Sequence, residues 1–196
     1  MTSSKNDYNS DSFQKFLDEQ QYNKNGILRY EMIFGETYVS TGGQETTTKF
    51  CDDLELKVGH THSLSTLTLT INSNILCMLC QSGMRMLDVG CGIGGSAFYV
   101  ARKYGMLVNG IDLSQNMIDI ANERRDLMSA GVKHRVQFHV EDATCMTYPA
   151  NFYDIVYSRD TILHIEDKES LFRKFLHCLK PGGMVVDIED ARCNAR

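Results

Sequence analysis

A glycine-rich segment that joins a strand-like run to a helical pattern constrains the fold of this chain more than any other feature. Residues 84–89 are mostly apolar, the loop 90–95 reads GCGIGG, and residues 96–104 show helical spacing. Glycine permits the tight turn and the close backbone approach that a ligand at a helix N-terminus requires. The glycines also match the G-x-G-x-x-G spacing of a dinucleotide-binding loop. The sequence therefore predicts a strand, a ligand-binding loop and a helix in succession.

Strand-like and helical patterns alternate after this loop. The expected strands cover 107–112, 135–140, 152–158 and 183–188, and the expected helices cover 114–130 and 168–179. Such alternation produces βαβ units and a parallel sheet with right-handed crossovers. Ligands of these sheets bind beyond the carboxyl ends of the strands, where the strand order reverses. The predicted fold class is therefore α/β, with the glycine loop at the first of these strand ends.

The rest of the pattern divides the chain into five parts. Residues 1–10 are polar and are expected to be disordered, whereas 11–58 carry helical patterns. Residues 60–82 are rich in Ser, Thr, Leu and Asn, fit neither pattern, and are expected to form an atypical loop insert. We assign 84–188 to the ligand-binding core and 189–196 to a divergent tail.

Three helices are expected between residues 11 and 58. The first begins near Asp11, and Gly26 is expected to break the chain before the second begins at Ile27. The third covers about 46–54. The glycines at 35, 42 and 43 are expected to bracket a loop between the second and third helices.

Composition excludes several classes of protein. The chain has 196 residues and a net charge of -5, which argues against general nucleic-acid binding because phosphate binding needs a positive surface. It has no apolar run long enough to span a membrane, and residues 1–7 lack the apolar region of a signal peptide. Seven cysteines, an odd number scattered along the chain, fit reduced thiols. We therefore expect one cytoplasmic domain that acts on a small molecule.

Three aspartates stand at the ends of successive predicted strands: Asp88, Asp112 and Asp142. Each acid taken alone is more often a solvated loop residue, but together they discriminate between two ligand classes. A dinucleotide would make the protein an oxidoreductase, yet Asp88 would repel its pyrophosphate. S-adenosylmethionine carries positive charge, and its ribose hydroxyls and adenine amino group can donate to Asp112 and Asp142. The predicted cofactor is therefore S-adenosylmethionine.

The 60–82 insert contains residues of the types that bind zinc. His60 and His62 with Cys77 and Cys80 could supply four zinc ligands, but their spacing is not that of a standard zinc finger. Unpaired thiols are the favoured interpretation, and no metal is predicted.

Several motifs around the glycine loop are more specific than the loop itself. They are FLDEQQY at 16–22, FGE at 34–36, YVSTGG at 38–43, GIDLS at 110–114 and YSRDTILH at 157–164. They resemble the motifs of phosphoethanolamine N-methyltransferases, most closely those of the second catalytic domain of the two-domain enzymes. The resemblance covers about 11–58 and 84–186. It implies a Rossmann-like class I S-adenosylmethionine-dependent methyltransferase fold with N-terminal helices over the active site, and methylation of phosphoethanolamine or its methylated forms toward phosphocholine.

The resemblance also implies residue roles by matched position. The catalytic pair of the family corresponds to Tyr22 and His164, and the residues around the substrate amino group correspond to Gln21, Tyr30 and Asp160. Cofactor-binding residues are expected at Ser40, Asp88, Gly90, Gly92, Asp112, Leu113, Asp142, Ala143 and Arg159. An ammonium must lose a proton before it can attack a methyl group, and histidine is a natural acceptor. The alternative roles are structural: Tyr22 could cover a core, and His164 could bond a helix end.

The sequence departs from the family pattern in two places. The 60–82 insert stands where the family has a short connection, and the resemblance stops after the strand expected at 183–188. The later strands of the sheet and the residues that hold the substrate phosphate are expected to be missing. The alternative function is therefore a truncated, catalytically impaired isoform, produced by an alternative transcript or by the gene model, that at most binds S-adenosylmethionine. The oligomeric state is left open.

Overall fold

The computed structural model describes residues 10–58 and 83–188, which form a parallel sheet flanked by helices. Its five strands lie in the order β3-β2-β1-β4-β5. Their bounds are β1 Arg85–Val89, β2 Leu107–Asp112, β3 Val136–Val140, β4 Tyr153–Arg159 and β5 Leu179–Ile188. The chain moves outward from β1 to β3 and then returns to β4 on the other side of β1. The strand order therefore switches beside β1, and the α/β fold class predicted from the sequence is confirmed.

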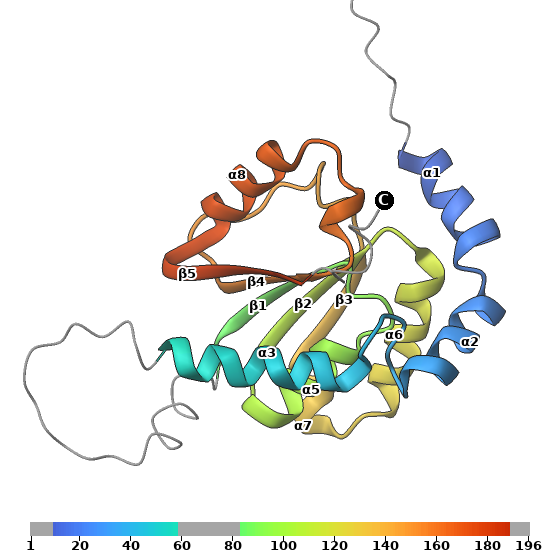
Figure 1. Cartoon of the computed structure of the whole chain (residues 1–196), viewed down its shortest axis with the longest axis horizontal. Helices are drawn as coiled ribbons and strands as arrows, with labels where there is room; N and C mark the ends of the chain where they lie inside the picture. Colours follow the sequence, from blue (N-terminus) through green and yellow to red (C-terminus); the bar gives the residue numbers. More distant parts are fainter. Residues whose placement is uncertain (1–9, 59–82, 189–196) are drawn as a thin grey trace, which may run out of the picture.

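The helices are α1 Ser10–Phe16, α2 Lys24–Phe34, α3 Gly43–Val58, α5 Gly95–Tyr104, α6 Gln115–Leu127, α7 Ala130–Lys133 and α8 Lys168–Cys178. Two shorter turns accompany them: the π-helical turn η1 Leu17–Gln21 and the 3-10 turn η2 Ile162–His164. Helix α8 covers one face of the sheet, and α3 and α5 lie on the other (Figure 1).

Alternation along the strands builds a core on each face of the sheet. Met86 and Val108 are buried against α5, whereas Leu87 and Ile111 are buried on the side of Phe175 in α8. Successive side chains of a strand point to opposite faces, so a sheet covered on both sides needs a nearly continuous apolar sequence. This explains why the strand sequences read as apolar runs rather than as an alternating pattern.

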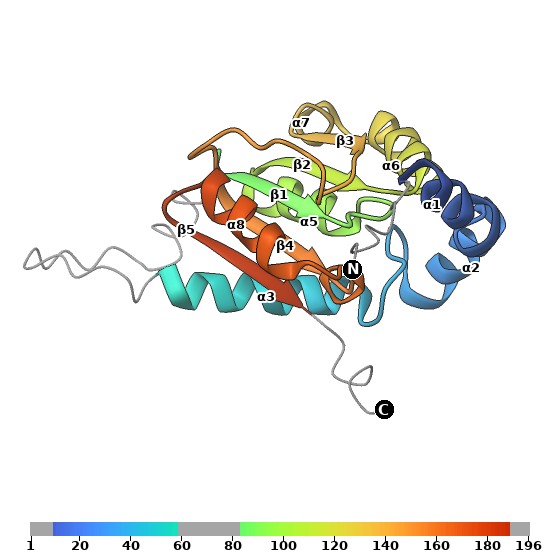
Figure 2. The same ribbon diagram turned by 90° about the horizontal axis from the view of Figure 1, so that it is seen from above.

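Helices α1 and α2 stand at the end of the sheet toward which the strands point, whereas α3 runs along one face of the sheet (Figure 2). Helix α2 is fixed to α6 by an ion pair between Glu31 and Arg124 in which both carboxylate oxygens accept from the guanidinium. Glu31 also accepts from the backbone N–H of Thr37 at 2.7 Å, so that the same carboxylate holds the loop after α2. Of the segment 11–58, only the part up to the end of α2 therefore lies at the ligand-binding end of the sheet, and its role as a cover of the active site stays a prediction.

Several boundaries predicted from the sequence are wrong. Gly26 does not break the chain: it lies in the first turn of α2, where its N–H donates to the N-cap side chain of Asn23 at 2.9 Å. Helix α3 is longer than 46–54, and Ser10, expected to be disordered, begins α1. Strand β5 begins at Leu179, before the glycines that suggested a later start: Leu179 pairs with Tyr153 of β4, and the register shifts before Met184 pairs with Ile155.

Some predictions concern residues outside the described part of the chain. They include the loop insert with its four candidate zinc ligands and the divergent tail. Among the described residues, no helix is long and apolar enough to cross a membrane.

Candidate active site

The glycine loop adopts the turn that its sequence predicts. Gly90 and Gly92 have φ values of +73° and +53°, in the left-handed region that favours glycine. A Cβ at Gly90 would lie 1.9 Å from Thr161 Oγ1, so a side chain there would also displace the segment after β4. The Gly90 N–H donates to Ile111 O at 2.8 Å, and the Gly92 N–H donates to Asp112 Oδ2 at 2.9 Å. The loop is thus tied to the end of β2.

Two of the predicted acids meet at this loop. Asp88 is the second-last residue of β1 and has 2% of its surface exposed, and its Oδ2 has no hydrogen-bond partner among the described residues. Burial and the neighbouring charge of Asp112 raise the pKa of Asp88 to about 7, although Arg159 lowers it. Asp112 stays partly exposed, and burial also raises its pKa. Two carboxylates this close favour a ligand that brings positive charge and hydrogen-bond donors.

The raised pKa of Asp88 predicts a pH dependence of stability in the protein without ligand. The ordinary pKa of 3.8 applies in the unfolded chain, so the folded protein binds one proton more between about pH 4 and pH 7. Stability should therefore fall as pH rises through this window. From pH 5 to pH 7, the free energy of unfolding of the wild type should fall by about 2 kcal/mol relative to that of Asp88→Asn, which has no carboxyl group to titrate at this position. Urea denaturation of both proteins at the two pH values measures this; a constant difference would contradict it.

The third predicted acid serves a local turn. Asp142 Oδ1 accepts from the N–H and the hydroxyl of Thr144 at 2.8 and 2.7 Å, and Oδ2 accepts from the Cys145 thiol at 3.5 Å. Ala143 is buried in the core under α8, and Leu113 lies half-buried after β2. Their contact with a cofactor stays a prediction.

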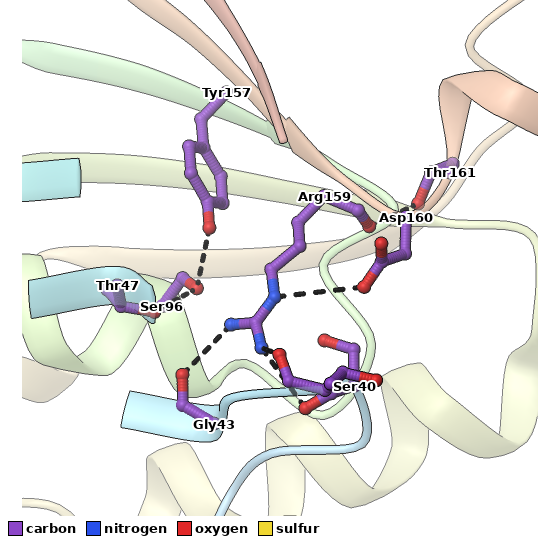
Figure 3. A network of polar contacts seen from close by, with 9 residues as sticks. Ser40, Gly43, Thr47, Ser96, Tyr157, Arg159, Asp160 and Thr161 are labelled. Atoms are coloured by element: carbon purple, nitrogen blue, oxygen red, sulfur yellow. Dashed lines mark hydrogen bonds and ion pairs between the residues drawn. The ribbon is translucent and has the colours of Figure 1, made fainter. Parts of the chain in front are cut away.

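Arg159 organises the loop that contains Ser40 (Figure 3). Its guanidinium donates to the main-chain oxygens of Ser40 at 3.1 Å and Gly43 at 2.9 Å, and also to that of Thr41. It lies 5.9 Å from the ring of Tyr38. These four residues come from the motif at 38–43, far from β4 in the sequence. The side chain of Arg159, predicted to contact the cofactor, is thus directed at the loop, and its cofactor contact stays a prediction.

Removal of this guanidinium should destabilise the fold. Arg159→Met keeps the apolar stem but leaves three main-chain oxygens without their donors, so the free energy of unfolding should fall by about 2 kcal/mol. Arg173 is the matched control, because among the described residues its exposed side chain pairs only with Glu169 on its own helix, and Arg173→Met should change little. Urea denaturation compares them; equal losses would contradict the assigned role.

Tyr22 follows η1 and reaches the glycine loop. Its ring packs against the cluster that contains Ile93 of the loop and Met117 of α6. Burial, followed by the charges of Asp112 and Tyr30, raises the pKa of its hydroxyl. Gln21 donates to this hydroxyl from its Nε2 at 3.2 Å. The structure thus brings together Tyr22, Gln21 and Asp112, three of the residues that the motifs singled out.

His164 and Asp160 lie after β4. His164 ends η2 with an exposed side chain, and its backbone N–H donates to Thr161 O at 3.0 Å. Asp160 has a φ of +52°, and its Oδ2 is 3.9 Å from Arg159 Nε. Within the described part of the chain, no hydrogen bond joins His164 to Tyr22. The two candidate catalytic residues therefore stand on separate elements, and their pairing stays a prediction.

The sequence reasoning missed three residues that hold the site together. Asp18, Ser114 and Asn116 join η1 to the start of α6 by hydrogen bonds. The helix expected from residue 114 marked where α6 starts, but nothing local linked Asp18 to residues almost a hundred positions away.

The fold and the site together define the class of the protein. A parallel sheet whose order switches at β1, with a glycine loop and two aspartates at that point, is the class I S-adenosylmethionine-dependent methyltransferase fold. The family model for the methyltransferase domain matches residues 87–187, and the chain belongs to this family.

Curated proteins similar to the chain include several phosphoethanolamine N-methyltransferases. Phosphoethanolamine N-methyltransferase 1 of Zea mays is 52% identical over 174 residues, which cover 89% of this chain and 29% of that protein. Phosphoethanolamine N-methyltransferase of Plasmodium falciparum is 36% identical over 180 residues, which cover 91% of this chain and 57% of that protein. The family resemblance predicted from the motifs is confirmed, and the chain spans 29% of the length of the maize relative.

Solved structures agree with this relationship. Phosphoethanolamine N-methyltransferase 2 of Haemonchus contortus, in complex with phosphomonomethylethanolamine and S-adenosylhomocysteine, superposes with a TM-score of 0.73 at 35% identity. The match covers 90% of this chain and 36% of that chain.

Proposed function

We propose that the chain is the catalytic core of an S-adenosylmethionine-dependent N-methyltransferase that acts on phosphoethanolamine or its methylated forms, toward phosphocholine. One observation carries the proposal: Tyr22, on the N-terminal segment, packs at the glycine loop, where the charge of Asp112 acts on its hydroxyl. A candidate proton-transfer group thus stands beside the candidate cofactor acid. The similarity to phosphoethanolamine N-methyltransferases supports the choice of substrate.

The residues at the loop fit S-adenosylmethionine. Asp112 has lone pairs left to accept from ribose hydroxyls, and the buried, unpartnered Oδ2 of Asp88 favours a positively charged ligand. The same carboxylate disfavours the pyrophosphate of a dinucleotide, so the oxidoreductase alternative has no support from the site. When bound, S-adenosylmethionine supplies a methyl group on a sulfonium, and transfer to nitrogen releases S-adenosylhomocysteine.

The chain's own residues would handle the proton and the substrate. A phosphoethanolamine ammonium has no free electron pair, so it must first give a proton to a base. His164, whose side chain is exposed, would take that proton directly or through the Tyr22 hydroxyl. Asp160 would hold the substrate cation, with Tyr30 and Gln21 beside the amino group. The nitrogen then forms its bond to the methyl carbon while the carbon–sulfur bond breaks.

Two measurements on the purified chain test this function. Calorimetric titration with S-adenosylhomocysteine and with NAD should give binding of the first alone; binding of NAD alone would overturn the proposal. Transfer of a radiolabelled methyl group to phosphoethanolamine, or to its monomethyl form, should then be detected. Cofactor binding without methyl transfer would support the impaired isoform instead.

A further inference from the structure

A line of hydrogen bonds runs from the acid beside the glycine loop to the main chain of Tyr22. The Ser114 N–H donates to Asp112 Oδ1 at 2.9 Å, and the Ser114 hydroxyl donates to Asp18 Oδ1 at 2.5 Å. Asn116 completes the line, because its Nδ2 donates to the main-chain oxygens of Asp18 and Tyr22, each at 3.0 Å. The cofactor acid and the candidate catalytic tyrosine are therefore joined through one helix start.

Asp18 fixes this connection at the N-terminus of α6. Its carboxylate accepts from the backbone N–H groups of Gln115 and Asn116, each at 3.2 Å. A carboxylate is favoured there because it satisfies unpaired N–H groups and faces the positive end of the helix dipole. The turn that carries Asp18 is thus attached directly after β2, where Asp112 stands.

The amide of Asn116 has a narrower role than general docking of the N-terminal helices. Helix α2 already has its own anchor in the Glu31–Arg124 ion pair. Both donors of the Asn116 amide are directed to oxygens of η1 and its end, where Tyr22 closes the π-helical turn by donating its N–H to Leu17 O. Single π-helical turns are frequent at functional sites because they displace side chains from the ordinary helical position.

We propose that Asn116 and Asp18 are positioning residues, which fix Tyr22 over the cofactor site and link its position to Asp112 through Ser114. This inference rests on the proposed function in giving Tyr22 a role in the reaction. The side chains of Asn116 and Asp18 together form what we call the clamp. The inference predicts that the clamp affects turnover without being part of the cofactor-binding surface.

Asn116→Asp tests the proposal, because it keeps the shape of the side chain, suits a helix N-terminus and lacks both donors. Hydrogen exchange of peptides covering 17–23 should become about tenfold faster, and kcat for methyl transfer should fall about tenfold. The dissociation constant for S-adenosylhomocysteine should stay within about threefold of the wild type. Asp18→Ala should act in the same direction. Gln115→Ala is the matched control, since the Gln115 side chain donates to Asp119 of its own helix and to nothing else in the described part of the chain.

Each outcome decides the matter. Exchange and kcat equal to those of the control would overturn the clamp, and faster exchange with an unchanged kcat would leave it a structural contact and overturn the positioning role. Failure of the wild type to bind S-adenosylhomocysteine would instead contradict the proposed function. In that case, the exchange rates of the ligand-free protein still decide whether the clamp holds Tyr22.

Discussion

Replacement of Asp112 by alanine is expected to weaken binding of S-adenosylhomocysteine by about 100-fold to 1,000-fold. In the proposed complex the carboxylate accepts from two ribose hydroxyls, and each hydrogen bond to a charged group contributes about 1.5–3 kcal/mol. The change also removes the acceptor of the Gly92 and Ser114 N–H groups, so the glycine loop keeps only its main-chain hydrogen bonds to Ile111 of β2. The loss of the ribose hydrogen bonds and the loosening of the loop should both weaken the binding of S-adenosylhomocysteine.

Calorimetric titration measures the loss, and two comparisons separate its causes. Asp126→Ala removes an exposed acid from the same stretch of chain and should leave the affinity unchanged. Asp112→Asn keeps one accepting oxygen, whereas the carboxylate has two, so it cannot serve the loop N–H groups and both ribose hydroxyls. The affinity of this variant for S-adenosylhomocysteine should therefore lie between those of the wild type and Asp112→Ala. An Asp112→Ala protein that binds as tightly as the wild type would refute the ribose assignment.

The sequence predicts that the glycine loop and Asp112 lie at neighbouring strand ends, and the structure brings them together, because the signals for both are local. The glycine loop directly follows the strand that contains Asp88, and Asp112 ends the next strand-like run along the chain. A parallel sheet then places the ends of β1 and β2 side by side without further information. Gly26 shows the limit of local reading: a glycine can break a helix or occupy its first turn, and the cap supplied by Asn23 decided between the two.

Other features of the site depend on contacts between distant segments. Arg159 was assigned to the cofactor by its motif, but its guanidinium is directed at the main chain of Ser40 and Gly43, and main-chain oxygens leave no trace in a sequence. Asp18 reads as one more polar residue of an N-terminal helix, although it caps α6. Such long-range contacts could not be predicted because each partner has an ordinary local explanation.

His164→Ala is expected to lower the turnover of methyl transfer by about 100-fold or more while leaving the affinity for S-adenosylhomocysteine unchanged. General acid–base groups contribute about 10²–10⁴ to rate, and in the proposed reaction the imidazole takes the ammonium proton. The side chain is exposed on η2 and has no hydrogen-bond partner within the described part of the chain, so its removal should not disturb the fold.

Kinetics and calorimetry on His164→Ala and on His177→Ala, an exposed histidine of α8, distinguish a chemical role from a structural one. The control should retain wild-type turnover. Added imidazole should restore part of the lost turnover in His164→Ala alone, because the exposed position leaves room for a small base to take the proton. A structural histidine would behave differently, since its loss would lower turnover and cofactor affinity together and free imidazole could not repair the fold. Parallel losses without rescue would therefore remove His164 from the proton path and leave the Tyr22 hydroxyl to be tested as the base.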